Sequence, residues 1–103
     1  HGPIALIEKD TVVIALATQP SVAQKTISNI LETAARGAKV ILIASQSQNT
    51  EGFEYVIRIP DVDPLLSCIP ATVLLQELAY YVAKEKGCDV DKPRNLAKSV
   101  TVE

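Results

Sequence analysis

The sequence predicts an α/β fold with a mainly parallel sheet, and two apolar runs with a helix between them support that prediction. Residues 11–17 and 40–44 are runs of aliphatic, largely β-branched side chains without polar alternation. Such runs are typical of strands buried on both faces of a parallel sheet. Residues 21–36 repeat apolar side chains at helical spacing. The order strand, helix, strand is that of a βαβ unit.

The helix predicted over residues 21–36 has clear signals at both ends. Pro20 and Ser21 favour its start, and Gly37 favours its end. Glu32 and Arg36 form a favourable i,i+4 pair on its polar side. The apolar stripe consists of Val22, Ala23, Ile27, Ile30, Leu31 and Ala34.

A third strand is predicted over residues 54–59, after a polar, turn-rich link over residues 45–52. Glu54 and Arg58 interrupt its apolar pattern, which indicates a strand at the edge of the sheet. The link is shorter than most parallel crossovers. We still expect a parallel strand, with a compressed helical turn at residues 49–53.

A long second helix is predicted over residues 65–86, with Gly87 as its stop. Asp63 and Pro64 resemble an N-cap followed by a first helical residue. Pro70 must restart or kink the helix, because proline lacks a backbone donor and crowds the preceding turn.

The predicted elements leave apolar surface uncovered. The helix is apolar nearly all round over residues 65–75, so it needs partners on more than one side. The strand over residues 11–17 reads as buried, yet nothing else in the chain is expected to pair with its outer edge. We therefore expect half of a doubly wound, flavodoxin-like domain, with three strands in the order 1-2-3 and two main helices.

Length and charge exclude several classes of protein. The chain has 103 residues, enough for one domain, and a net charge of −2. That charge offers no basic stripe for nucleic acid. The longest uninterrupted apolar run, residues 12–17, is far shorter than the ~20 residues of a membrane helix, so no membrane partner is expected. The chain begins without Met, which suggests processing or a piece of a longer protein.

The two cysteines, Cys68 and Cys88, lie twenty positions apart, and the single histidine, His1, is remote from both in sequence. This pattern fits neither a disulfide framework nor a metal site. A reduced, cytoplasmic protein is the expectation. Cys68 falls within an apolar helical pattern and is expected to be a small core residue.

Three segments carry a more specific signal. The tail reads Asp-Val-Asp-Lys-Pro-Arg-Asn-Leu-Ala-Lys-Ser-Val-Thr-Val-Glu over residues 89–103, and the chain opens with His-Gly-Pro-Ile-Ala-Leu-Ile. Residues 75–80 read Leu-Gln-Glu-Leu-Ala-Tyr. Together these segments resemble the glutamine–fructose-6-phosphate aminotransferase (isomerizing) family, the glucosamine-6-phosphate synthases. The resemblance implies that residues 1–88 are the carboxyl-terminal part of a sugar-isomerase (SIS) domain and that residues 89–103 are a carboxyl-terminal active-site tail.

The resemblance also implies a reaction. Members of the family convert fructose 6-phosphate and glutamine to glucosamine 6-phosphate and glutamate, in hexosamine biosynthesis, as homodimers. Neither a metal nor an organic cofactor is implied. Glutamine-derived ammonia comes from a glutaminase domain that this chain does not contain, so the chain alone is expected to be inactive.

Two residues are implied to be catalytic. In the family, the lysine that matches Lys98 binds the sugar and forms a Schiff base with open-chain fructose 6-phosphate, for which the amine must be uncharged. The histidine that matches His1 reaches the neighbouring subunit's site and helps to open the sugar ring. The alternatives are a solvated lysine in a loose terminus and a remnant of an expression tag.

Three further tail residues receive roles from the same resemblance. Ala97 matches a position whose backbone contacts the sugar, and Arg94 and Asn95 look like anchors that hold the tail to the body. Two other functions remain open. One is a non-catalytic sugar-phosphate-binding SIS module, which would not need Lys98, and the other is a dimerisation half-domain.

Residues 45–50, Ser-Gln-Ser-Gln-Asn-Thr, are similar to the Ser-Gln-Ser-Gly-Glu-Thr phosphate loop of SIS domains. Hydroxyls and loop N–H groups can hold a phosphate. However, Gln48 replaces the glycine that allows close backbone approach, and the matching family position is a variable turn. A plain polar turn is therefore favoured over a phosphate site.

Overall fold

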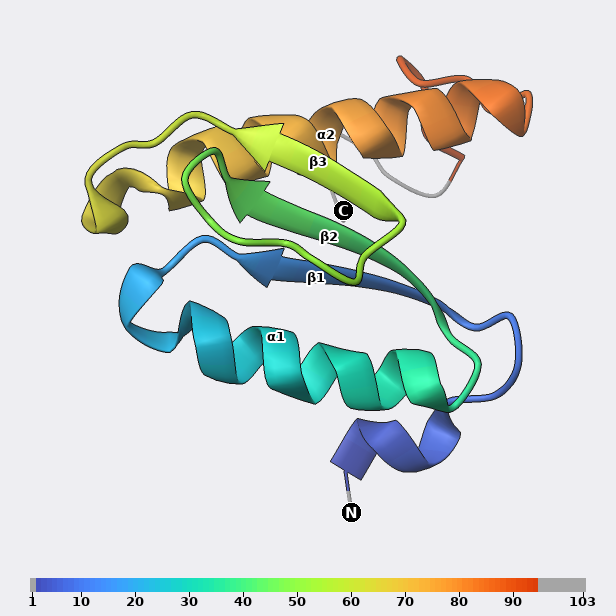
Figure 1. Ribbon diagram of the computed structural model, residues 1–103. Coiled ribbons are helices and arrows are strands. Elements are labelled where there is room, and N and C mark those ends of the chain that lie inside the picture. The colour runs from blue at the N-terminus through green and yellow to red at the C-terminus, as the bar shows by residue number, and fades with distance from the viewer. Residues whose placement is uncertain (1, 95–103) are drawn as a thin grey trace, which may run out of the picture. The chain divides into compact units, whose positions relative to one another are not determined.

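The computed structural model describes residues 2–94 of the chain. The chain divides into two compact units, His1–Ala71 and Thr72–Glu103. The first unit holds the three strands and the first long helix (Figure 1). In chain order the elements are η1 (Gly2–Leu6), β1 (Val12–Ala17), α1 (Pro20–Ala35), β2 (Lys39–Ser45), β3 (Tyr55–Ile59), η2 (Pro64–Leu66) and α2 (Cys68–Glu85).

The three strands form one parallel sheet in the order β1-β2-β3. In its register Ile14 lies beside Ile41, and Ile43 lies beside Ile57. Helix α1 connects β1 to β2, as a βαβ unit requires. The predicted α/β class, the strand order and the parallel direction are therefore confirmed, and β3 lies at an edge as its charged residues indicated.

Helix α1 packs on one face of the sheet through small and aliphatic side chains (Figure 1). Pro20 stands in its first turn, where a missing N–H costs no intrahelical bond. After the helix, Gly37 adopts a φ of +94°, and a Cβ there would lie 3.2 Å from the Cα of Lys9. The buried core of this layer consists of Ala17, Ala23, Ile30, Val40, Leu42 and Ala44.

Truncation of Leu42, which is 0% exposed, should destabilise the fold strongly. Leu42→Ala removes buried methyl groups and leaves a cavity between α1 and the sheet, so we expect a loss of about 2–5 kcal/mol in the free energy of unfolding. The matched control is Leu65→Ala, because Leu65 is 87% exposed. Urea titrations followed by circular dichroism measure both variants, and equal losses would contradict this account of the core.

The link between β2 and β3 differs from the expectation. No helix forms at residues 49–53. The chain turns instead through bonds from the Gln48 N–H to the Ser45 carbonyl and from the Phe53 N–H to the Thr50 carbonyl. The Asn49 Oδ1 atom accepts the N–H of Glu51 at 2.9 Å, which closes a further tight turn. Polar side chains that bond to the nearby backbone outcompete helix in so short a segment.

The predicted start signals, Asp63 and Pro64, begin the short helix η2 and not the long helix itself. The Asp63 Oδ1 atom accepts the N–H of Leu65 at 2.9 Å and caps η2, with Pro64 as its first residue. Helix α2 then begins at Cys68, so Pro70 falls in its first turn, where its missing N–H would have had no intrahelical acceptor. The expected restart near Pro70 is confirmed, and α2 continues without interruption to Glu85.

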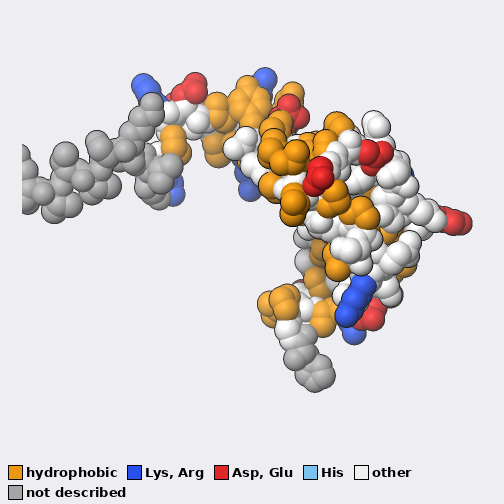
Figure 2. Space-filling view, turned by 90° about the vertical axis from the view of Figure 1, so that its left-hand side faces the viewer, with side chains coloured by type: hydrophobic (Ala, Val, Ile, Leu, Met, Phe, Trp, Pro, Cys, Tyr) orange, Lys and Arg blue, Asp and Glu red, His pale blue; other side chains and the backbone are white. Residues whose placement is uncertain are grey.

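The expectation that Cys68 is a core residue is wrong, because its side chain is exposed. The neighbours that are buried are Ser67 and Ala71. Much of the surface in Figure 2 is apolar, with charged side chains scattered rather than gathered in one patch. The exposed apolar side chains of η2 and α2 are Leu65, Leu66, Ile69, Val73, Tyr80, Tyr81 and Val82. The expected bare surface at residues 65–75 is therefore present.

The residues Pro64–Glu85 are long and apolar enough to cross a membrane, judged by length and composition alone, with a mean hydropathy of 1.4 in their most apolar window. This stretch contains polar residues such as Gln76 and Glu77, so it is not an uninterrupted apolar run. It is apolar only on average. Core helices of water-soluble proteins meet the same criterion. This property alone therefore does not assign the helix to a membrane.

Candidate functional site

The polar loop after β2 lies at the carboxyl end of the sheet, the edge at which doubly wound folds bind ligands. Arg58 of β3 reaches into this loop. Its Nη1 atom donates to the carbonyl oxygens of Ser45 at 2.8 Å and Gln48 at 2.6 Å, and its Nη2 atom donates to Thr50 Oγ1 at 2.6 Å. The guanidinium therefore holds the loop in shape and has these donors already engaged.

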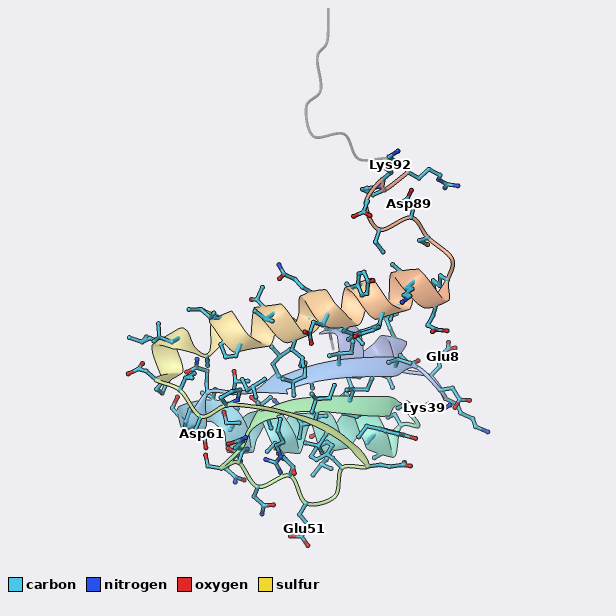
Figure 3. The ribbon with its side chains drawn as sticks, turned by 90° about the horizontal axis from the view of Figure 1, so that it is seen from above. Glu8, Lys39, Glu51, Asp61, Asp89 and Lys92 are labelled. Carbon is cyan, nitrogen blue, oxygen red and sulfur yellow. The ribbon has the colours of Figure 1, made fainter. Side chains whose placement is uncertain are left out.

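A carboxylate occupies the position where a phosphate would need donors. The Asp61 Oδ1 atom accepts the N–H of Ser47 at 3.2 Å and the Ser47 hydroxyl at 2.9 Å. Lys39 is the first residue of β2, and Figure 3 shows Asp61 at the other end of the sheet. Asp61 therefore lies at the carboxyl end of the strands. A bound phosphate would be repelled by this negative charge and would have to displace both bonds. These contacts favour the polar-turn interpretation of residues 45–50.

A second polar cluster at the same edge was not anticipated from the sequence. Gln19, directly after β1, donates from Nε2 to the carbonyl of Pro64 at 2.6 Å and to Ser67 Oγ at 2.8 Å. Ser67 is only 3% exposed, and its hydroxyl also lies 2.9 Å from the Pro64 carbonyl. The cluster ties the end of β1 to η2 and gives the buried hydroxyl its partners. The only sequence signal was a glutamine between a strand and Pro20.

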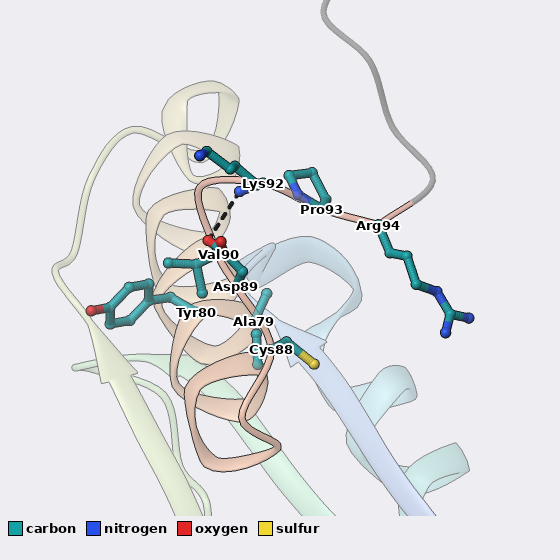
Figure 4. Close-up of a pocket in the computed structure, with 9 residues that line it drawn as sticks. Ala79, Tyr80, Cys88, Asp89, Val90, Lys92, Pro93 and Arg94 are labelled. Carbon is teal, nitrogen blue, oxygen red and sulfur yellow. Dashed lines mark hydrogen bonds between the residues drawn. The ribbon is translucent and has the colours of Figure 1, made fainter.

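The root of the tail forms a defined turn after α2. The Asp89 Oδ1 atom accepts the N–H groups of Asp91 at 3.0 Å and Lys92 at 3.1 Å (Figure 4). An open cavity of about 870 Å³ lies between this turn and the last turns of α2. Its lining consists of Ala79, Tyr80, Ala83, Cys88, Asp89, Val90, Lys92, Pro93 and Arg94. The turn thus defines the path of the chain from the end of α2 to Lys92.

The cysteines and carboxylates of the described residues do not form a metal centre. Within residues 2–94 no group of three or more His, Cys, Asp or Glu side chains could hold a metal ion. Cys68 and Cys88 are both free thiols on the surface. The described residues therefore offer hydrogen-bonding groups and cations, but no assembled catalytic constellation.

The whole chain aligns with curated proteins of one name. It is 55% identical to the glutamine–fructose-6-phosphate aminotransferase (isomerizing) of Clostridium acetobutylicum and 58% identical to that of Clostridium tetani, in each case over 100% of this chain and 17% of the relative. The chain is homologous to the carboxyl-terminal part of these aminotransferases. It spans about a sixth of their length. No protein-family model matches the chain.

A solved structure agrees with this relationship to the aminotransferases. The carboxyl-terminal domain of glucosamine-fructose-6-phosphate aminotransferase from Francisella tularensis superposes with a TM-score of 0.77 at 33% identity. The match covers 87% of this chain and 26% of that one. The expected α/β half-domain is therefore similar to part of that enzyme's carboxyl-terminal domain.

Most of the predicted aminotransferase site residues fall outside the part of the chain that the structure describes. His1, Asn95, Ala97 and Lys98 lie outside the described residues. Arg94 is described, is exposed and lines the cavity at the tail root (Figure 4). Among the described residues its guanidinium makes no ion pair, so its anchoring role stays a prediction.

Proposed function

We propose that this chain forms the carboxyl-terminal isomerase part of an enzyme that converts fructose 6-phosphate and glutamine to glucosamine 6-phosphate and glutamate. The observation that carries the proposal is the alignment of the whole chain, its irregular tail included, with aminotransferases of that name at 55% and 58% identity. The fold agrees, because the solved neighbour is the carboxyl-terminal domain of such an enzyme.

In this proposal the tail supplies the chemistry. The uncharged Nζ atom of Lys98 attacks the C2 carbonyl of open-chain fructose 6-phosphate, and an imine forms with loss of water. The imine makes the neighbouring C1–H bond more acidic, which prepares the sugar for isomerisation. The imidazole of His1 transfers a proton to the ring oxygen during ring opening. The backbone of Ala97 contacts the sugar, and Arg94 and Asn95 hold the tail in place.

The remaining components of the reaction come from outside these 103 residues. Ammonia is released from glutamine by a glutaminase domain, and His1 acts in the site of the neighbouring subunit of a homodimer. We place the protein in the cytoplasm, away from membranes and nucleic acids. The free surface thiols of Cys68 and Cys88 support a reducing compartment, and the net charge of −2 gives nucleic acid no basic surface.

Borohydride trapping in the complete enzyme tests this function. Borohydride reduces an imine to a stable amine, so incubation with fructose 6-phosphate should add the reduced sugar phosphate to the peptide that carries Lys98. Omission of the sugar is the control, and mass spectrometry of the digest locates the label. Binding of fructose 6-phosphate without any adduct would instead favour the non-catalytic sugar-phosphate-binding module.

A further inference from the structure

The chain that leaves α2 is bonded back to the helix. The N–H of Gly87 donates to the carbonyl of Lys84 at 3.0 Å, and the N–H of Cys88 donates to the carbonyl of Ala83 at 2.9 Å. These two bonds form a Schellman motif, for which Gly87 supplies the left-handed backbone with a φ of +69°. The helix therefore sets the direction of the first residues that follow it.

Asp89 continues this order beyond the helix. Its Oδ1 atom accepts both the N–H of Asp91 at 3.0 Å and the N–H of Lys92 at 3.1 Å (Figure 4). Pro93 comes next, and its ring fixes its own φ and disfavours the helical conformation for Lys92. Hydrogen bonds and the proline ring thus restrict the backbone over the whole stretch from Gly87 to Pro93.

The Asp89 carboxylate has no other structural task among the described residues. Its side chain is exposed, and within residues 2–94 it forms no ion pair. Asp91 is also exposed, but it contributes only its backbone N–H to the turn, and its side chain forms no hydrogen bond within that range. The two carboxylates carry the same charge, and only that of Asp89 holds the turn.

We propose that Asp89 is a positioning residue for Lys98, which lies nine positions further along the chain. The proposal rests on the function proposed above, in which the Lys98 amine attacks the sugar. That attack requires the amine and the C2 carbonyl to meet in a narrow range of geometries. A restricted connection to α2 limits the directions that the tail can take, so less conformational entropy is lost when the amine reaches the carbonyl. Asp89 acts through the backbone and does not touch the sugar.

Replacement of Asp89 in the complete enzyme tests this role. Asp89→Ala removes the acceptor, so we expect kcat for glucosamine 6-phosphate to fall at least ~10-fold, because small misplacements of a reacting group have effects of this size. The borohydride adduct on Lys98 should form more slowly to the same extent. Asp89→Asn keeps an Oδ1 acceptor and loses the charge, so it should retain most of the turnover. Asp91→Ala, the matched control for charge, should do the same.

Amide hydrogen exchange shows whether the turn itself has changed. The N–H groups of Asp91 and Lys92 should exchange faster in Asp89→Ala than in the parent enzyme or in Asp89→Asn. The unfolding temperature should stay the same in all variants, because the side chain at position 89 is exposed.

Two results would overturn the positioning role while leaving the proposed function intact. One is full turnover and full labelling of Lys98 in Asp89→Ala. The other is an equal loss in Asp89→Asn and Asp89→Ala, which would assign the effect to charge and not to the turn. A parent enzyme that forms product but no adduct on Lys98 would instead refute the proposed chemistry of the tail, and the positioning role with it.

Discussion

Replacement of Lys98 by arginine in the complete enzyme should lower the turnover of glucosamine 6-phosphate at least ~10³-fold, the scale on which loss of a catalytic group acts. A guanidinium stays protonated and does not form a sugar imine under these conditions. The positive charge is kept, so a role in binding the phosphate or the tail would survive the change. Loss of turnover together with loss of the borohydride adduct therefore reports the amine itself.

Lys92→Arg is the matched control for this substitution. Lys92 stands six positions earlier, at the described root of the tail, where its backbone N–H bonds to Asp89. The change of its side chain leaves that bond in place, so turnover should remain within about twofold of the parent enzyme, as for most exposed substitutions. Glutamine hydrolysis is measured in the same samples, and it should persist in Lys98→Arg. Equal turnover in the two variants would withdraw the catalytic role from Lys98.

The sequence was sufficient for the sheet because burial and backbone direction leave a strong pattern. The runs around Ile14 and Leu42 have no polar alternation, which is typical of strands in a parallel sheet. The expected burial on both faces holds for Leu42 but not for β1, where Ile14 is 41% exposed. Asp63 and Pro64 marked the start of η2 because capping depends on the residue itself. Edge placement of β3 followed from Arg58, since a charge on a central strand would have no solvent or partner.

Features that depend on contacts between residues far apart in the sequence could not be predicted from local patterns. The link at residues 49–53 turned out without a helix, because Arg58 and Asn49 bond to its backbone and side chains. Gln19 and Ser67 are 48 positions apart, and no local pattern joins them. Cys68 lies on an apolar helix, but only Ser67 and Ala71 beside it are buried. The site residues in the tail were recognised from resemblance, and local periodicity carried no information about them.

The 103-residue chain by itself should form no glucosamine 6-phosphate above the background without enzyme. Residues 2–94 form no site in which a nucleophile could attack glutamine. The side chains of Arg58 and Gln19 form hydrogen bonds within the fold. This chain spans only 17% of the length of the aminotransferase relative from Clostridium acetobutylicum. Ammonium salts supplied in place of glutamine should not restore synthesis, because the ammonia source is not the only missing component.

Labelling of the isolated chain makes this prediction sharper. We expect the remainder of the enzyme to desolvate the Lys98 amine. In the isolated chain, fructose 6-phosphate and borohydride should therefore modify Lys98 little more than Lys84 or Lys92, which are both exposed. In the complete enzyme the same treatment should concentrate the label on Lys98. The ratio of tail label to Lys84 label, measured by peptide mass spectrometry, compares the two states directly. Selective labelling of Lys98 in the isolated chain, or measurable product, would mean that these 103 residues assemble a sugar site on their own.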